Sequence, residues 1–192
     1  MRKIIFTLIW LSVFSLLITP SYGFWIFNPK AGSWTDPKQS VKPTPKEQLK
    51  FIQELYGQGK HQEAVDESKK LVKNYPKAYE ASEAQFYIGL SFEGMRKPFE
   101  AYKAYQKAID KYPFSSRIDE IIERQLKIGQ AFMSGEKRKA MGVKLPVENP
   151  SIEIFRKVVE NSSYGKYAAH AQYLLGMTLK NLSRYQEARD EF

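Results

Sequence analysis

Residues 84–113, AQFYIGLSFEGMRKPFEAYKAYQKAIDKYP, contain the spacing that decides the fold. The key positions alternate between small and aromatic residues and end in proline: Gly89, Phe92, Ala101, Tyr105, Ala108 and Pro113. Small residues on two helices allow the helix axes to approach closely, and aromatic residues fill the space beside the crossing. Because proline cannot continue a helix, Pro113 ends the second one. The stretch therefore predicts two antiparallel helices packed against each other.

The same frame recurs along the chain, since AQYLLG at residues 171–176 repeats AQFYIG at residues 84–89. In the first copy Ile52 stands where the other copies have a glycine, and Gly59 lies in the turn between the helices. We expect four copies, at about 45–81, 82–118, 122–168 (with an insertion at 136–150) and 169–192 (incomplete). The residues expected to pack the repeats are Ala64, Pro76, Gly89, Ala101, Tyr105, Ala108, Pro113, Gly129, Gly176 and Ala188.

This recurring order of small, aromatic and small residues followed by proline is typical of tetratricopeptide repeats (TPR). The predicted fold is therefore all-α, a right-handed TPR solenoid of about three and a half repeats. In such a solenoid each repeat buries the face of its neighbour, and the stack forms a concave surface. The alternative is an unrelated helical bundle, which four copies in register disfavour.

The N-terminus reads as a targeting segment. Residues 1–23, MRKIIFTLIWLSVFSLLITPSYG, begin with positive charges, continue with an uncharged apolar stretch and end with small residues, as a secretory signal does. We expect cleavage after Gly23; the alternative is an uncleaved membrane anchor, although the apolar stretch is short for a span of about 20 residues. Residues 24–45 contain four prolines and are predicted to form an extended arm. The aromatic residues of this arm would pack on the domain, on a partner or at a membrane surface, and the solenoid follows at 46–192.

The composition argues against several classes of function. The 192 residues include no Cys, which excludes disulfides and thiolate chemistry, and the two histidines, His61 and His170, lie far apart in the chain. The net charge is +9, but most basic residues are interleaved with acidic ones, as on solvated helix faces. No RRM, KH or zinc-finger pattern indicates nucleic-acid binding. No carboxylate is paired with a His or a hydroxyl at a recognisable catalytic spacing. We therefore predict no enzyme, cofactor, metal site or nucleic-acid partner.

The repeat tails carry a family resemblance. Three residues beyond a minimal repeat follow Pro76, which gives the 37-residue step to Pro113. With NYPKAYEASEAQFYIG and DKYPFSSRIDE, residues 44–192 resemble the BamD-like outer-membrane protein assembly lipoproteins, and the order of signal, arm and repeats and the insertion in the third repeat match as well. The resemblance implies a periplasmic protein at the outer membrane that helps deliver unfolded β-barrel proteins to the insertion machine.

Two departures from that family affect the expectation. The family carries a lipidated Cys just after the signal, and this chain has no Cys, so it cannot be a lipoprotein as written. The family also continues for further repeats, whereas this chain stops at Phe192, within the second helix of the fourth copy. We therefore expect further repeats in the complete protein, including those that would hold the barrel insertase.

Candidate binding residues follow from the repeat frame. The concave groove of a TPR solenoid is lined by the first helix of each repeat, just before and after the small residue. Aromatic, Met and amide side chains at these positions suit an extended peptide with apolar side chains; the alternative for each is core packing. The candidates are Leu49, Gln53, Tyr56, Phe86, Leu90, Glu93, Leu126, Gln130, Met133, Tyr173 and Met177. Lys180 is the only Lys expected in the groove, which argues against a tight clamp for a peptide carboxylate.

The insertion in the third repeat is predicted to emerge at the tip of the solenoid. Its basic cluster, Lys137, Arg138 and Lys139, is a candidate docking loop for an acidic partner or for anionic lipid head groups. The alternative is a solvated loop without a partner.

Together these observations predict a periplasmic scaffold, associated with the outer membrane, that binds unfolded or extended polypeptide. Its partners would be unfolded outer-membrane proteins or subunits of the assembly machine. The alternative is a general envelope adapter linked to cell-wall synthesis or cell division. For stability, we expect Gly89→Leu to overpack the helix crossing, and Glu93→Gln, on the open face, to cost little.

Overall fold

The computed structural model describes residues 26–28, 32–35, 40–135, 149–162 and 165–192, and the chain divides into two units, Met1–Ser40 and Val41–Phe192. In the first unit, β1 (Ile26–Asn28) and β2 (Ser33–Thr35) form an antiparallel two-stranded ribbon, with Phe27 paired to Trp34. This short hairpin lies within the segment for which the prolines predict an extended arm. The predicted signal at 1–23 lies outside the described residues.

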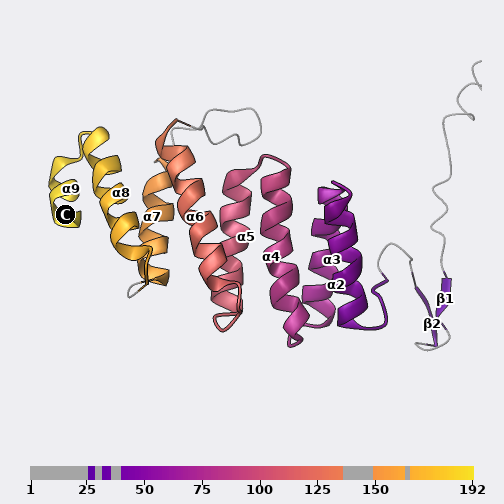
Figure 1. The fold of residues 1–192 in the computed structure, drawn as a ribbon. Coiled ribbons are helices and arrows are strands. Elements are labelled where there is room, and N and C mark those ends of the chain that lie inside the picture. The colour runs from indigo at the N-terminus through magenta and orange to yellow at the C-terminus, as the bar shows by residue number, and fades with distance from the viewer. Residues whose placement is uncertain (1–25, 29–31, 36–39, 136–148, 163–164) are drawn as a thin grey trace, which may run out of the picture. The chain divides into compact units, whose positions relative to one another are not determined.

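In the second unit, the described residues form helices that pack in antiparallel pairs, each pair against the next (Figure 1). The helices are α2 (Pro45–Gly57), α3 (His61–Asn74), α4 (Tyr79–Gly94), α5 (Pro98–Lys111), α6 (Ile118–Met133), α7 (Pro150–Asn161), α8 (Ala168–Asn181) and α9 (Tyr185–Glu191). We call α2, α4, α6 and α8 the A helices and their partners α3, α5, α7 and α9 the B helices. The predicted all-α fold is confirmed, although α4 begins three residues before the expected start of the second repeat.

One type of turn joins the A helix to the B helix in three of the pairs. Gly59, Arg96 and Ser183 each have a positive φ, between 56° and 74°. The amide of the next residue donates to the carbonyl five positions back in all three turns: Lys60 to Leu55, Lys97 to Phe92 and Arg184 to Leu179. This is the Schellman arrangement, which satisfies carbonyls at the helix end and reverses the chain in a few residues.

The helix starts follow from capping residues in the sequence. The side chain of Thr44 accepts a hydrogen bond from the amide of Glu47, and Pro45 occupies the first turn of α2. Asn149 caps α7 in the same way, and Pro150 begins that helix. Proline suits the first helical turn because its missing N–H is not needed there.

A buried glutamine ties the segment before α2 to the first helix pair. Gln48 is fully buried, and its side-chain carbonyl accepts from the amide of Lys42 at 2.8 Å while its amide donates to Glu67 of α3 at 2.7 Å. The hydroxyl of Tyr75, just after α3, donates to the carbonyl of Lys42. Buried polar groups need such partners, so Gln48 fixes the entry of the chain into α2.

The crossing of α4 and α5 depends on a glycine. A Cβ atom placed on Gly89 would lie 2.1 Å from Cε1 of Tyr105, whose side chain is fully buried. The third pair repeats this contact, because a Cβ on Gly129 would lie 2.5 Å from Phe155. In the last pair Gly176 faces Phe192. The A helices α4, α6 and α8 therefore each lie directly on an aromatic ring, which belongs to α5, to α7 and to the residue that follows α9.

The remaining predicted packing residues divide into two groups. The alanines are buried at the helix contacts: Ala64, Ala101, Ala108 and Ala188. The prolines are exposed: Pro76 and Pro113 each lie two residues beyond the end of a B helix. The prolines thus mark helix ends and contribute no core packing.

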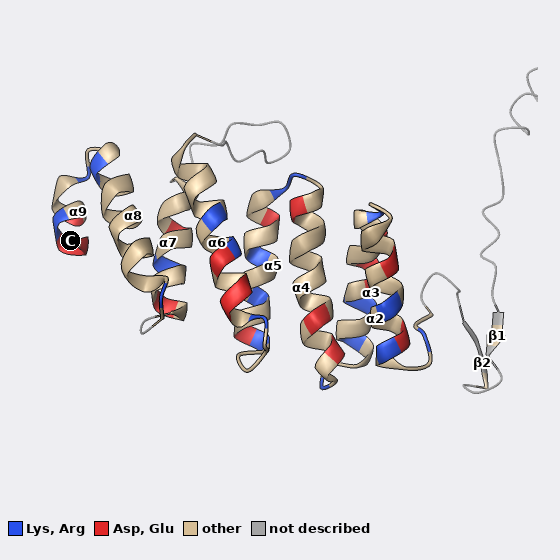
Figure 2. Ribbon diagram, viewed as in Figure 1, with Lys and Arg blue, Asp and Glu red and all other residues tan. Residues whose placement is uncertain are grey.

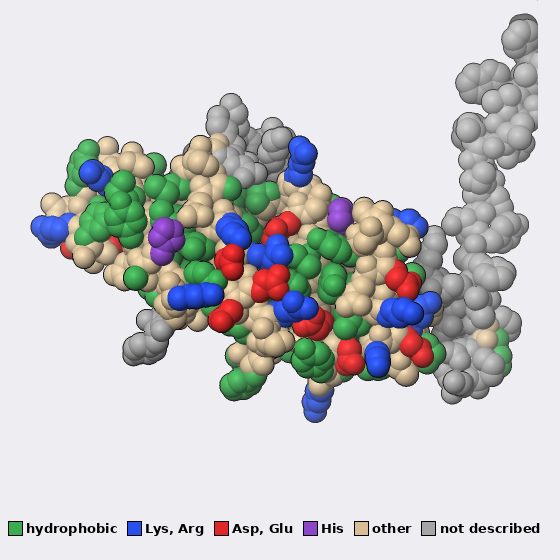
Figure 3. All heavy atoms as spheres, in the orientation of Figure 1, with side chains coloured by type: hydrophobic (Ala, Val, Ile, Leu, Met, Phe, Trp, Pro, Cys, Tyr) green, Lys and Arg blue, Asp and Glu red, His purple; other side chains and the backbone are tan. Residues whose placement is uncertain are grey.

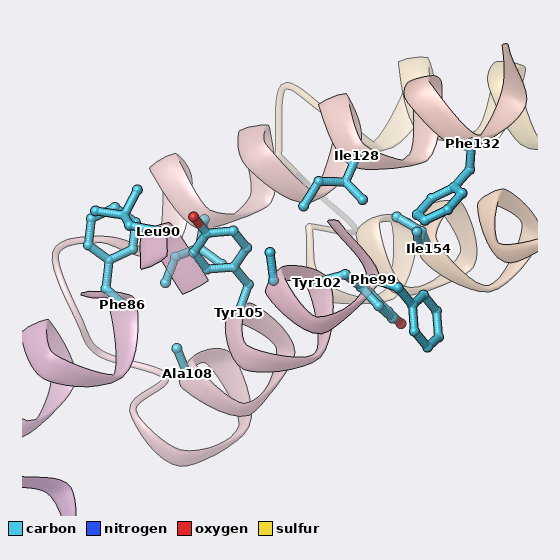
Figure 4. Close-up of a cluster of buried hydrophobic side chains, with 11 residues drawn as sticks. Phe86, Leu90, Phe99, Tyr102, Tyr105, Ala108, Ile128, Phe132 and Ile154 are labelled. Atoms are coloured by element: carbon cyan, nitrogen blue, oxygen red, sulfur yellow. The ribbon is translucent and has the colours of Figure 1, made fainter. Parts of the chain in front are cut away.

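The largest core cluster joins the second pair to the third. Figure 4 shows Phe86 and Leu90 of α4 beside Tyr105 of α5, with Phe132 of α6 and Ile154 of α7 farther along the same cluster. A solenoid has this kind of continuous core because each pair buries the apolar face of its neighbour. Among the described residues, no helix has the length and apolar composition needed to cross a membrane.

Candidate peptide-binding surface

The surface formed by the A helices, here called the A face, carries a network of ion pairs between α4 and α6. Arg117, at the start of α6, donates from Nε to Oε1 and from Nη2 to Oε2 of Glu83, both at 3.0 Å. Only 7% of the Glu83 side chain is exposed, so this carboxylate depends on its partner. The hydrogen bonds to Glu83 raise the pKa of Arg117 above its ordinary value, so the guanidinium stays charged.

A second carboxylate, Glu93, joins the same network at the end of α4, where it is the last residue but one. Glu93 accepts from the hydroxyl of Tyr105 at 2.5 Å and pairs with Nη1 of Arg124 at 3.1 Å. Glu120 links the two halves, since it accepts from Arg117 and from Arg124, each at 3.0 Å. Burial first, and then the hydrogen bond to Glu93, raise the pKa of Tyr105 far above its ordinary value. Tyr105 is therefore a permanent donor to Glu93.

This network makes the middle of the A face nearly neutral. Figure 2 shows acidic and basic residues alternating along α6, and Figure 3 shows their side chains next to one another over the central helices. Phe86 lies beneath it, with the guanidinium carbons of Arg117 and Arg124 5.1 and 5.7 Å from its ring centre. The paired charges offer little net attraction to a charged ligand, and they cover the aromatic ring.

Three of the predicted groove residues belong to the core. Phe86, Leu90 and Leu126 are 2%, 9% and 6% exposed and lie within hydrophobic clusters. The prediction that they line a groove is corrected accordingly. The reason is that Phe86 and Leu90 pack in one cluster with Tyr105, and Leu126 packs in another with Phe155. Arg117 and Arg124 also lie over the ring of Phe86.

The other predicted groove residues are at least partly accessible and fall into separate groups. Gln53 and Tyr173 are exposed, and Leu49, Tyr56, Glu93, Gln130, Met133 and Met177 are half-buried. Tyr56 packs edge-on against Tyr87 and beside His61, with ring centres 5.5 and 5.3 Å apart. The structure thus places Tyr56 with other aromatic residues near the first turn of the solenoid.

A second group lies over α6 and α8. The side-chain amide nitrogen of Gln130 is 3.3 Å from Nε2 of His170, which joins these two A helices. Met133 packs against the cluster between α6, α7 and α8. Tyr173 is 53% exposed, and its ring centre is 6.1 Å from that of Phe192. An aromatic ring, an amide and an imidazole therefore lie along the C-terminal part of the A face.

A pocket of about 330 Å³ lies between these groups, where the turn from α4 to α5 meets α6. Its floor is apolar, from Pro98, Ile128 and Ala131, and Arg96 and Lys127 lie at its rim. Glu93 and Arg124 also line it, so the pocket borders the ion-pair network. An apolar floor with a few polar groups above it is the usual form of a ligand site in proteins.

The sequence pattern did not reveal this pocket or the network. The charges of α6 follow one another at helical spacing in IDEIIERQLK, which indicates a solvated face. Their partners on α4 are 31 and 34 residues away, a separation at which spacing carries no information. The predicted docking-loop residues Lys137, Arg138 and Lys139 lie outside the described residues.

The helix pairs, their tight turns and the glycine crossings define a class of helical-repeat protein. Residues 54–78 and 83–115 match the tetratricopeptide repeat family, and these segments contain α3, α5 and most of α4. No curated protein shows significant similarity to the chain. Together with the stacked pairs, the match confirms the predicted TPR solenoid. Tetratricopeptide repeats are protein-interaction scaffolds and typically not catalytic, so the repeats imply protein partners.

Proposed function

We propose that the protein is a periplasmic scaffold that binds unfolded or extended polypeptide on its A face, for the assembly of β-barrel proteins in the outer membrane. The main support for polypeptide binding is the pocket, which has an apolar floor of Pro98, Ile128 and Ala131 and a cationic rim. The signal-like residues 1–23 and the repeat tails that resemble the BamD-like family support the location and the class of substrate.

The pocket suits one apolar side chain of an extended segment. Successive side chains of an extended chain point to opposite sides, so one can enter the pocket while its neighbours face solvent. Arg96 and Lys127 can donate to carbonyl oxygens of the segment, and Gln130 is one turn beyond Lys127 on the same side of α6. A site that contacts backbone and one apolar side chain accepts many sequences, as a carrier of unfolded proteins requires.

The binding site can be tested by filling the pocket. Ala131→Trp places a large ring on the floor from a half-buried position, and Ala169→Trp makes the same change at an exposed position of α8. The probe is a urea-denatured β-barrel outer-membrane protein diluted into buffer, with binding followed by fluorescence anisotropy. We expect Ala131→Trp to weaken binding about tenfold or more and Ala169→Trp to bind as wild type. Equal affinity of the two variants, with both folded by circular dichroism, would contradict the site.

The cellular role requires a separate experiment. Tagged full-length protein is isolated from cell envelopes with its partners, and its N-terminus is sequenced. Recovery of a barrel insertase with a mature N-terminus near Phe24 supports the proposal. Recovery of cell-wall synthesis or division enzymes alone would favour the alternative of a general envelope adapter, and an intact Met1 in the membrane fraction would indicate an uncleaved anchor.

A further inference from the structure

A second groove lies on the other side of α4, away from the A face. It has a volume of about 430 Å³ and runs between the B helices α3 and α5, over α4. Ile88 and Phe92 of α4 and Ala104 of α5 form its apolar floor. An α-helix has 3.6 residues per turn, so side chains on opposite faces of α4 can be told apart by their spacing. By this spacing Ile88 and Phe92 point nearly opposite to the side of α4 that carries Glu83, Phe86 and Glu93. The groove is therefore independent of the pocket described above.

Three lysines line this groove: Lys69 of α3 and Lys103 and Lys107 of α5. All three are exposed, and within the described part of the chain no carboxylate lies within ion-pair distance of their ammonium groups. The ammonium of Lys103 lies 4.9 Å from the ring centre of Phe99. Glu100 is the acidic residue among the groove's lining, which leaves two net positive charges around an apolar floor. The A face differs from the groove in this respect, because its cations Arg117 and Arg124 form ion pairs with glutamates.

We infer that this lysine groove (Lys69, Ile88, Phe92, Lys103, Ala104 and Lys107) is a second docking site, for an acidic segment of a partner protein that inserts apolar side chains between α3 and α5. The floor requires apolar groups on the ligand, and the ammonium groups, which have no carboxylate partner among the described residues, require carboxylates beside them. A flat membrane surface would meet the lysines and leave the recessed floor empty, so the two features together select a peptide. The protein thus holds a client on one face and an acidic partner on the other.

The test uses the full chain and two short fluorescein-labelled peptides. In the first, Leu and Phe alternate with Asp and Glu; in the second, Lys replaces the acidic residues. We expect saturable binding of the acidic peptide alone, weakening as salt rises and screens the charges. The variant K69E/K103E/K107E should bind it about tenfold or more weakly, because each substitution turns an attraction into a repulsion.

A matched variant separates the groove from overall charge. K46E/K60E/K73E changes three exposed lysines elsewhere, on α2, in the turn before α3 and on α3, and alters the net charge equally. It should bind the acidic peptide nearly as wild type. Because the chain has no Cys, single labels can also be placed at Glu100→Cys in the groove and Glu54→Cys on α2. The peptide should change the emission of the first label and not of the second.

Several results would overturn the inference. Equal affinity of the two triple variants, or equal binding of the acidic and basic peptides, would show that the groove does not select its ligand. Absence of peptide binding together with lysine-dependent sedimentation on phosphatidylglycerol vesicles would assign the surface to a membrane. The Ala131→Trp substitution fills the A-face pocket and leaves the lysine groove intact. The two proposed binding sites can therefore be tested independently.

Discussion

At the scale of single residues, the helix crossing between α4 and α5 depends on the absence of one Cβ atom. Gly89→Ala places that atom 2.1 Å from the buried ring of Tyr105, which is below any normal contact. The ring is fully buried in a packed core, so we expect a loss of about 1–3 kcal/mol in the free energy of unfolding. Urea denaturation followed by circular dichroism measures this loss.

The control for this prediction is the same substitution at an open position. A Cβ on Gly57, the last residue of α2, meets no atom within 4 Å. Alanine favours helix over glycine by up to about 1 kcal/mol, so Gly57→Ala should leave stability unchanged or raise it. If both variants lost the same free energy, the glycine contact with Tyr105 would not hold the crossing.

Glu93 shows how a single residue can be misread from its position on a helix. The sequence places it on an open face, where Glu93→Gln would cost little. In the structure the Glu93 carboxylate accepts a hydrogen bond from the Tyr105 hydroxyl and forms an ion pair with Arg124. The neutral amide of Glu93→Gln would be a weaker partner for both groups. We correct the expectation and predict a loss of about 1–3 kcal/mol, measured by thermal or urea unfolding.

An exposed ion pair provides the comparison for Glu93. Glu54 lies 4.0 Å from Lys50 on α2, and both side chains are more than half exposed. Such pairs contribute little because water screens them, so Glu54→Gln should change stability by about 0.5 kcal/mol or less. A similar loss in both variants would argue that the network on the A face is no stronger than a surface pair.

At the scale of elements, the turns α2–α3, α4–α5 and α8–α9 share one backbone geometry but not one residue type. Ser183 and Gly59 both have positive φ, which costs a residue with a Cβ about 1–2 kcal/mol. We therefore expect Ser183→Gly to stabilise the α8–α9 turn by up to about 1 kcal/mol and Gly59→Ser to destabilise the α2–α3 turn by a similar amount. A Cβ on Gly59 has open space around it. The loss of stability in Gly59→Ser would therefore come from backbone strain and not from a steric clash. Melting temperatures that shift in the same direction for both variants would contradict this account.

At the scale of the helical unit, stability should vary along the stack. Ten of the 16 residues of α4 are buried, and α2, α3 and α5 pack against it. By contrast, Ala188 is the one buried residue of the seven in α9. Repeat proteins open locally from weakly buried elements, so native-state hydrogen exchange should be slowest in α4 and fastest in α9. Uniform protection of all helices would show that the unit opens as one cooperative block instead.

The sequence by itself determined the helical-repeat fold, because that fold depends on spacing within a few turns of helix. Gly89 and Tyr105 are 16 residues apart, and the pair of helices that joins them is short enough for the pattern of small and aromatic residues to specify their contact. Only the tertiary structure decided the binding surface. Glu83 and Glu93 meet arginines of the next repeat, Phe86 is covered, and the lysine groove opens between α3 and α5. These features depend on how closely neighbouring pairs approach, and that distance is set by the packing of whole helices, which no local spacing records.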